Sequence, residues 1–560
     1  MDVLIHSGMI LPERRCSPRY SRSSGSYSRF DRRTMHQRTT FLPIVLAMVS
    51  TCMGQGPALD WVKNIGGPAW DACRAVAPTS DGGSIVVGYT ESDTGDVSGN
   101  HGGSDVMLVR LDPGGEVIWQ RSYGGSGQEE AYAVLSTADG GSIFVGCAES
   151  SDGDLTQNHG GYDLWVVRTD ADGDLLWQRS YGGSGGEYLG SIVETPDGGY
   201  LVTCHTNSDD GDVQGWHAGY HLGQPNTDVW VLRLDPTGGI VWSRCLGGSR
   251  FELSKSAAVC HEGGFIIGCG TSSPDGDVVG YHYSADINDL DAWLVKLNSE
   301  GAIVWSHAYG GTGREQYTTV REAPNGDLLF SGSTNSADGD VSQNNGDHDV
   351  WVVRTSATGE LLWERCYGGP EMEVAYGMVL REDGRPYVIG TVRSDPVIHP
   401  GSHEAMDAWF LALDAQGNVE QEKFIGGSAN DSGFHLCGST DQSLLLVGSS
   451  YSADGDIPNN QGDVDGWVAH LDVNETGLES LSATGLFIAP TIATDRIIVS
   501  SPAQDGPSTL HLFDMNGRRV RERATIGLTT VLDVADLPRG PYVVSMTHAG
   551  NRMTARFTLE

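Results

Sequence analysis

The sequence predicts an all-β protein: a seven-bladed β-propeller closed by its N-terminal strand, followed by a small C-terminal β-sandwich of the Ig-like type. Three observations support this prediction. Each repeat reads as four short strands, and the first and last repeats are incomplete in complementary ways. A Gly-Gly pair recurs 58 to 65 residues apart, starting at Gly66, Gly124, Gly182, Gly247, Gly310, Gly368 and Gly426. Self-similarity at such a period is typical of propellers and other repeat folds.

The N-terminal segment, residues 1–54, has the order of a secretory signal peptide. An apolar run covers residues 41–49, with Arg38 before it and small residues from Ser50 to Gly54 after it. The run is too short to span a bilayer core of ~30 Å as a helix. We expect translation to start at Met35 and the mature chain to be exported without a transmembrane segment. A competing interpretation makes Cys52 a lipid-modified residue.

The repeats in residues 55–477 carry two tryptophan series. One lies five residues before the Gly-Gly pair: Trp61, Trp119, Trp177, Trp242, Trp305 and Trp363, with Gln421 as the exception. The other follows an Asp by two residues: Trp165, Trp230, Trp293, Trp351, Trp409 and Trp467, with Met107 in the first repeat. Recurrence at fixed positions predicts packing between neighbouring repeats. Tight Asp-Gly turns between apolar runs indicate hairpins.

The two ends of the repeat region predict how the propeller closes. Residues 59–64 read as a fourth strand without its first three, and the last repeat ends at Asp472 after three strands. Pairing of these ends closes the ring and removes a free sheet edge. An open solenoid is the alternative, although it does not require complementary ends.

The composition excludes several classes of protein. The 560 residues include 35 Lys or Arg against 73 Asp or Glu, for a net charge of −38, and only four are Lys. Nucleic acid binding requires clustered cations, so we expect no nucleic acid partner. The 14 Trp and 19 Tyr argue against disorder. We expect an acidic, folded monomer.

Five loops with the sequence Asp-Gly-Asp, the DGD loops, form candidate metal sites. Each precedes an Asp that opens the third strand of its repeat. Three oxygen donors per repeat suit Ca²⁺, which takes 6 to 8 oxygens. The alternative is that the carboxylates cap backbone N–H groups in turns. The candidate calcium ligands are Asp152, Asp154, Asp163, Asp338, Asp340 and Asp349.

Two enlarged loops, residues 214–227 and 279–290, break the repeat symmetry. In a four-stranded meander they share one face with the DGD and Gly-Gly loops, and loops on a rigid scaffold often bind ligands. His101 and His159 share their loop position with two histidines of the enlarged loops, which favours a structural hydrogen bond there. Loops that pack on themselves are the alternative to a binding site. The candidate ligand-binding residues are Trp70, Trp216, His217, Tyr220, His221, Tyr281, His282 and Tyr283.

Three sequence motifs for catalysis or metal binding are absent: there is no CxxC, HExxH or P-loop. We therefore assign no catalytic residue. Eight cysteines follow the signal region, and several occupy equivalent positions in different repeats. Such positions do not bring two Cα atoms within disulfide distance, so we expect most of these cysteines to be small buried residues.

The C-terminal region, residues 478–560, alternates apolar and polar residues around Asn-Gly and Gly turns, which indicates a small antiparallel sandwich. Residues 512–520, LFDMNGRRV, and 537–546, LPRGPYVVSM, resemble the type A sorting domain of the type IX secretion system of Bacteroidetes. The chain has Ala489, Pro490 and Thr491 where that family usually begins with Pro-Asn-Pro. The residues that carry the resemblance are Leu512, Asp514, Asn516, Gly517, Arg518, Leu537, Gly540 and Tyr542.

The resemblance implies passage across the outer membrane by the type IX machinery, followed by release or surface attachment. The repeats also resemble the propeller repeat proteins that accompany such domains. We expect a secreted or surface protein that binds a glycan, matrix or protein ligand through its DGD-loop face and is not an enzyme. Two alternatives stay open: a polysaccharide hydrolase or lyase using His217, His221 or His282 beside an Asp, and a structural spacer.

Overall fold

The computed structural model describes residues 57–221, 224–284, 289–393, 401–403 and 405–473. Toward the C-terminus it describes residues 487–489, 492–493, 496–500, 508–514, 518–525, 529–535, 537–548 and 551–559. Within these ranges the regular secondary structure consists of strands, as the all-β prediction requires. The predicted signal peptide, with Met35 and Cys52, lies outside the described residues.

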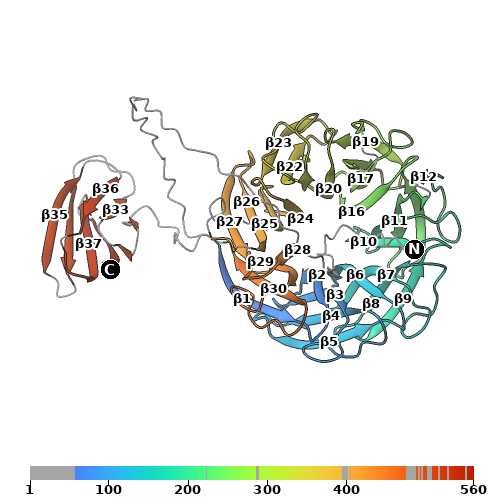
Figure 1. Ribbon diagram of the computed structural model, residues 1–560, viewed down its shortest axis with the longest axis horizontal. Helices are drawn as coiled ribbons and strands as arrows, with labels where there is room; N and C mark the ends of the chain where they lie inside the picture. The colour runs from blue at the N-terminus through green and yellow to red at the C-terminus, as the bar shows by residue number, and fades with distance from the viewer. Residues whose placement is uncertain are drawn as a thin grey trace, which may run out of the picture. The chain divides into compact units, whose positions relative to one another are not determined.

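The described residues before position 474 form seven four-stranded antiparallel sheets arranged as blades around a common axis (Figure 1). The first blade consists of β2 (Asp71–Pro78), β3 (Ser84–Thr90), β4 (Asp105–Leu111) and β5 (Val117–Tyr123). The second consists of β6 (Glu129–Ser136), β7 (Ser142–Ala148), β8 (Asp163–Thr169) and β9 (Leu175–Tyr181). The third consists of β10 (Glu187–Glu194), β11 (Tyr200–Thr206), β14 (Asp228–Leu234) and β15 (Ile240–Leu246). A short hairpin, β12 (Tyr220–His221) with β13 (Gln224–Pro225), interrupts the third blade.

The remaining blades repeat the pattern. The fourth is β16 (Glu252–Val259), β17 (Phe265–Thr271), β18 (Asp291–Leu297) and β19 (Ile303–Tyr309), and the fifth is β20 (Glu315–Glu322), β21 (Leu328–Thr334), β22 (Asp349–Thr355) and β23 (Leu361–Tyr367). The sixth is β24 (Glu373–Leu380), β25 (Pro386–Arg393), β26 (Met406–Leu413) and β27 (Val419–Ile425), and the seventh is β28 (Asp431–Gly438), β29 (Leu444–Ser450), β30 (Asp465–Asp472) and β1 (Ala58–Ile65).

The N-terminal strand β1 completes the last blade. It pairs antiparallel with β30, from Ala58 opposite Asp472 to Ile65 opposite Gly466. The seventh blade therefore takes three strands from the end of the repeat region and its fourth from the beginning. The predicted closure by the N-terminal strand is confirmed, and it leaves β30 without an open edge.

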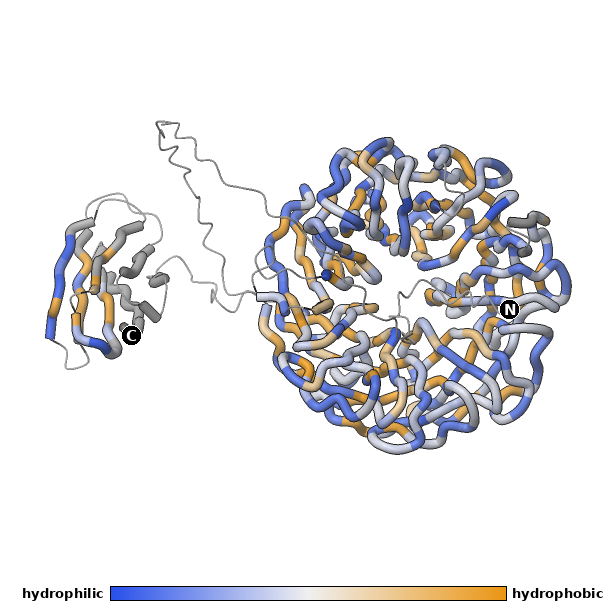
Figure 2. The backbone as a smooth tube through the Cα atoms, viewed as in Figure 1, coloured by the Kyte–Doolittle hydropathy of each residue, from blue (hydrophilic) through white to orange (hydrophobic). Residues whose placement is uncertain are grey.

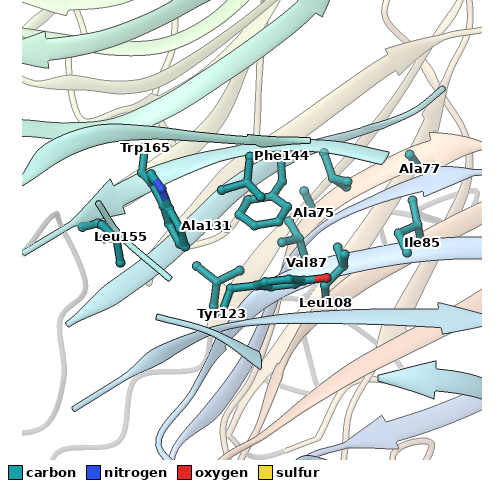
Figure 3. Close-up of a cluster of buried hydrophobic side chains, with 14 residues drawn as sticks. Ala75, Ala77, Ile85, Val87, Leu108, Tyr123, Ala131, Phe144, Leu155 and Trp165 are labelled. Atoms are coloured by element: carbon teal, nitrogen blue, oxygen red, sulfur yellow. The ribbon is translucent and has the colours of Figure 1, made fainter. Parts of the chain in front are cut away.

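The hydrophobic core lies between adjacent blades rather than in one central cluster. Figure 3 shows one such layer, in which Leu108 and Tyr123 of the first blade meet Phe144 and Trp165 of the second. The second and third strands of most blades are buried on both faces, because each is covered by a neighbouring blade on either side. Figure 2 shows the resulting alternation of hydrophobic strands and hydrophilic loops.

Both tryptophan series pack as predicted. In the series that follows an Asp, Trp165, Trp230, Trp293, Trp351 and Trp467 are fully buried. In the other series, Trp119 lies in β5 of the first blade and packs over the turn between β8 and β9 of the second blade. Its Nε1 donates to Ala171 O at 3.2 Å. A Cβ at Gly173 would lie 2.9 Å from the Trp119 ring, and Gly173 has φ +80°. Only glycine satisfies both requirements.

The C-terminal residues form two sheets of their own. One contains β31 (Phe487–Ala489), β33 (Arg496–Ser500) and β36 (Thr529–Asp533), and the other contains β32 (Ile492–Ala493), β38 (Asn551–Leu559), β37 (Gly540–His548), β34 (Ser508–Asp514) and β35 (Arg519–Thr525). The two sequence motifs of this region lie on the neighbouring strands β34 and β37, with Asp514 opposite Tyr542.

The residues of the two C-terminal motifs differ in burial and in hydrogen bonding. Leu512 is buried, and the Tyr542 hydroxyl donates to Pro538 O at 2.6 Å, which fixes the start of β37. Arg518 is exposed and Leu537 is half-buried, while Asn516 and Gly517 lie outside the described residues.

The eight cysteines from Cys73 to Cys437 are free thiols, and six of them are buried. Within the described ranges, no helix is long and apolar enough to cross a membrane.

Ring closure can be tested at Ile65, which is fully buried in a cluster that joins the first and seventh blades. We expect Ile65→Ala to lower the free energy of unfolding by about 2–5 kcal/mol, because the lost methyl groups leave a cavity. Urea denaturation followed by tryptophan fluorescence measures the change. Val241→Ala is the matched control, since Val241 is 60% exposed and its loss should cost under about 0.5 kcal/mol. Equal stability of both variants would contradict closure by β1.

Candidate functional site

Each blade begins with a buried acidic side chain that binds the loop joining it to the preceding blade. These acids open the innermost strands, and each carboxylate accepts a hydrogen bond from the second glycine of the Gly-Gly pair four residues earlier. The seven acids are Asp71, Glu129, Glu187, Glu252, Glu315, Glu373 and Asp431. Their N···O distances run from 2.7 Å at Asp71 to 3.3 Å at Glu315. The recurrent glycine pair is thus the backbone donor of an inter-blade clamp.

The first glycine of the pair lies between two buried carboxylates. A Cβ at Gly124 would be 2.6 Å from Asp105 Oδ1 and 2.8 Å from Glu129 Oε2. Asp105 belongs to one blade and Glu129 to the next, so any side chain here would separate the blades. This close approach explains why the pair is glycine in all seven repeats.

The DGD loops fold back onto the same glycine loops. Asp152 Oδ1 accepts from Ser126 N at 2.8 Å, and Asp154 Oδ2 accepts from Gly124 N at 3.1 Å. Asp338 and Asp340 make the equivalent bonds with Thr312 N at 2.7 Å and Gly310 N at 3.2 Å. The DGD carboxylates therefore cap backbone N–H groups, which was the alternative to metal ligation.

The Asp that opens the third strand has a separate set of donors. Asp163 Oδ2 accepts from the backbone N of His159 at 2.9 Å and contacts its Nδ1 at 2.6 Å. Asp349 accepts from both the backbone and the side-chain amide of Asn345. Among the described residues, no group of three or more His, Cys, Asp or Glu is arranged to hold a metal ion. Calcium binding at these loops stays a prediction.

The shared loop histidines make a repeated contact with the third-strand Asp. His101, His159, His217 and His282 each place Nδ1 within 3.0 Å of a buried carboxylate oxygen. His403 does the same with Asp407 at 3.0 Å, although the sequence reasoning did not include it. Its position four residues before Asp407, the same spacing as His101 before Asp105, is the signal that identifies it.

The histidines of the enlarged loops also reach the next blade. His217 Nε2 lies 3.9 Å from Asp277 Oδ2, and His282 Nε2 lies 3.7 Å from Asp340 Oδ2. The hydrogen bond to Asp228 raises the pKa of His217 above its ordinary value, and that to Asp291 raises the pKa of His282. Each ring thus lies between two carboxylates from adjacent blades, and the two enlarged loops are neighbours.

The aromatic candidates differ in exposure. Trp216 is half-buried against the core of the third blade, and Tyr281 packs against that of the fourth. Tyr283 is 72% exposed. Tyr220 and His221 form strand β12 of the short hairpin. Trp70 lies at another blade junction, where its ring contacts Tyr451 edge-on at 6.5 Å, so the structure does not group it with the other candidates.

A further set of residues lies on the innermost strands, where the sequence reasoning placed no candidate. The third residue after each buried acid is Arg74, Tyr132, Gly190, Lys255, Thr318, Tyr376 or Phe434. These positions vary in charge and size. Two of them, Arg74 and Lys255, are cations in a chain with a net charge of −38 and only four lysines, and this is the sequence signal that identifies the set.

Burial shifts the titration of the inter-blade acids. Desolvation raises the pKa of Glu252 to about 8 and the pKa values of Glu315 and Glu373 to about 7. The hydrogen bonds to these carboxylates lower the pKa, but their effect is smaller than that of burial. The neighbouring carboxylate of the preceding blade acts in the same direction as burial. These clamps therefore carry protons at mildly acidic pH.

Comparisons with known proteins identify one part of the chain. Residues 488–560 match the family described as the secretion system C-terminal sorting domain. The resemblance predicted from the two C-terminal motifs is confirmed, and the type IX sorting domain marks the protein for secretion with surface attachment or release. No curated protein matches the chain.

Several solved structures are similar to this chain. The Neurospora crassa Pan2 WD40 domain has a TM-score of 0.42 at 9% identity, covering 74% of this chain and 96% of that chain. YCF48 bound to D1 peptide has a TM-score of 0.37 at 10% identity, covering 75% and 99%. A puromycin hydrolase has a TM-score of 0.30 at 13% identity, covering 68% and 58%.

The raised pKa of Glu252 predicts how stability depends on pH. The folded protein keeps a proton up to about pH 8 that the unfolded chain releases near its ordinary value of 4.5. Stability from this group is therefore complete below pH 4.5 and is lost as the pH rises to about 8. Between pH 5 and pH 8 we expect the free energy of unfolding to fall less in Glu252→Gln than in the unaltered protein. The difference between the two falls should be on the order of 1–4 kcal/mol.

Urea denaturation at a series of pH values measures this difference. Glu116→Gln is the control, because the Glu116 side chain is 76% exposed and should titrate alike in folded and unfolded chains. Parallel pH profiles for Glu252→Gln and the unaltered protein would show that Glu252 is ionised throughout.

Proposed function

We propose that this protein is a non-enzymatic secreted or cell-surface β-propeller that binds a glycan, matrix or protein ligand through its loop face. The contact region in this proposal is formed by the enlarged loops of the third and fourth blades, residues 214–227 and 279–290. Export is directed by the C-terminal sorting domain at residues 488–560.

The observation that carries the binding proposal is the exposure of Tyr283. A tyrosine that leaves 72% of its surface in solvent, within a loop that breaks the repeat, has no role in packing the blades. Tyrosine offers a flat apolar face and a hydroxyl, which suits sugar rings and protein surfaces. The contact of His217 with Asp277 holds the neighbouring loop beside it.

The surrounding loops supply a rigid platform for this contact. The DGD carboxylates and the Gly-Gly backbone are bonded to each other, as at Asp152 and Ser126. Such a framework costs little ordering entropy when a ligand binds, which favours affinity.

The histidines on this face support a binding role over hydrolysis. Nδ1 of His217 contacts the buried Asp228, and its Nε2 faces Asp277. His282 has the matching pair in Asp291 and Asp340. Both rings recur at a shared repeat position, and a repeated contact of this type is explained by blade docking without any catalytic step.

The export proposal predicts the result of truncation. A chain that ends after Val473 lacks the sorting domain, so we expect it to accumulate in the periplasm instead of reaching the cell surface. Protease accessibility on intact cells, followed by cell fractionation, distinguishes the two locations. The full chain expressed at the same level is the control. Normal surface display of the truncated chain would refute the sorting role.

The binding proposal predicts the effect of removing the exposed aromatic side chain. We expect Tyr283→Ala to lose most of the binding to a glycan or matrix-protein array that the unaltered protein shows, because it removes the main contact area without touching the core. Val241→Ala, which removes exposed apolar surface elsewhere, should bind normally. Retained binding by Tyr283→Ala, or loss in both variants, would count against the loop face.

A further inference from the structure

The innermost strand of every blade carries a β-bulge at the same place. The register against the second strand shifts between Cys73 and Ala75 in β2, and the equivalent shifts occur in β6, β10, β16, β20, β24 and β28. A bulge inserts an extra residue and turns its side chain away from the regular alternation. In five of these strands the extra residue is the third one after the buried acid, and in β10 and β20 the shift spans the second and third residues after it.

These bulged residues form what we call the axial ring: Arg74, Tyr132, Gly190, Lys255, Thr318, Tyr376 and Phe434. Figure 1 places their strands, β2, β6, β10, β16, β20, β24 and β28, around the middle of the propeller. Two members are cations and three are aromatic, while Gly190 and Thr318 are small. In the other five blades the ring member is a cation or an aromatic residue on the strand nearest the propeller axis.

Contacts between blades show that the large members of the ring converge. The Arg74 guanidinium lies 4.7 Å from the Phe434 ring centre and 5.9 Å from that of Tyr132. The Phe434 and Tyr376 rings meet edge-on at 5.5 Å. Lys255 Nζ lies 6.0 Å from the Tyr376 ring centre, although Lys255 belongs to the fourth blade and Tyr376 to the sixth. Contact between blades that are not neighbours occurs because these side chains reach across the axis.

The charge of this cluster is opposite to that of the chain. The protein has a net charge of −38 and only four lysines, yet Lys255 and Arg74 are close enough at its axis for the Arg74 charge to act on Lys255. Burial and the Arg74 charge lower the pKa of Lys255 to about 8. His435 lies close by, and burial with Arg321 and Lys255 lowers its pKa to about 3, so it adds no charge at neutral pH. Glu130 is the nearby acid, and it accepts from the Tyr132 hydroxyl.

The aromatic rings stabilise these cations without neutralising them. A cation over a ring face gains about 0.5–2 kcal/mol, and the ring keeps no formal charge. Arg74 Nε is buried and has no hydrogen-bond partner within the described part of the chain, and no described carboxylate forms an ion pair with Arg74. An anion at the axis would satisfy this donor and reduce the repulsion between the two cations.

We propose that the axial ring binds a carboxylate carried on a ring-shaped molecule, such as a uronic acid. The Arg74 guanidinium offers planar donors that match a carboxylate, and Lys255 adds a second charge. Tyr132, Tyr376 and Phe434 supply faces against which a sugar or aromatic ring packs. Gly190 and Thr318 are the two small members of the ring and add no charge. This site is separate from the loop face and goes beyond the function proposed for it.

Isothermal titration calorimetry of the full secreted chain with glucuronate tests the proposal, with glucose as the uncharged control. We expect glucuronate to bind and glucose not to bind, and binding should weaken as salt is added, because the charge contact is screened. A parallel titration with benzoate identifies the ring: tighter benzoate binding assigns the site to aromatic acids, and tighter glucuronate binding assigns it to sugar acids.

Two variants of the axial ring and two controls locate the bound anion. We expect Arg74→Gln and Lys255→Gln each to weaken glucuronate binding about tenfold or more, the loss typical of one charge-assisted contact. Lys63→Gln is the matched control, since this lysine lies on the outermost strand β1 and pairs with Glu116. Tyr283→Ala should bind glucuronate normally, which separates the axial ring from the loop face.

Each outcome either supports or overturns an anion site at the axial ring. Absence of heat with both glucuronate and benzoate would overturn the proposal, as would unchanged binding in both Arg74→Gln and Lys255→Gln. Loss of binding in Tyr283→Ala alone would place the anion on the loop face and leave the proposed function intact. Thermal unfolding of each variant confirms that it is folded, and if one of the two ring variants does not fold, the other carries the test.

Discussion

The hydrogen bond from the Gly-Gly loop to the buried acid of the next blade is the interaction on which the rest of the structure depends. At Glu129, for example, one carboxylate accepts Gly125 N and the backbone N of Ser150, and so joins the incoming loop to the loop between the second and third strands. A buried backbone N–H without a partner costs about 1–3 kcal/mol, so the acid and the loop require each other. Repetition of this bond in seven blades sets the distance between neighbouring sheets and brings the chain ends together.

This clamp accounts for part of the acidic charge of the chain, and its carboxylates are not available for other chemistry. The carboxylates of the inter-blade clamps and of the DGD loops are occupied by backbone donors, as at Asp152 and Asp154. Identical contacts recur from blade to blade, and recurrence assigns them to the framework. Function is therefore expected where the repeat is broken: at the enlarged loops with the exposed Tyr283, and at the axial ring, where Arg74 and Lys255 introduce positive charge.

The predictable part of the fold followed from local chemistry that the sequence displays directly. Asp-Gly turns, alternating apolar runs and tryptophans at fixed positions predicted four strands per repeat and packing such as Trp165 in the core. Complementary ends predicted the pairing of β1 with β30. The loop candidates were predicted less completely, because exposure depends on packing. Trp216 turned inward against the third blade, and Trp70 lies at a different junction.

The sequence by itself determined the repeat, the strand order within it, the closure of the ring and the export signal at the C-terminus, since each depends on residues close together or on self-similar spacing. Tertiary structure alone decided which side chains meet across the axis. A bulge of one residue turns Lys255 and Phe434 toward positions that strand alternation does not predict, and their contacts with Tyr376 and Arg74 join residues more than a hundred positions apart. Neighbours of this kind are created by closing the ring, so no local pattern records them.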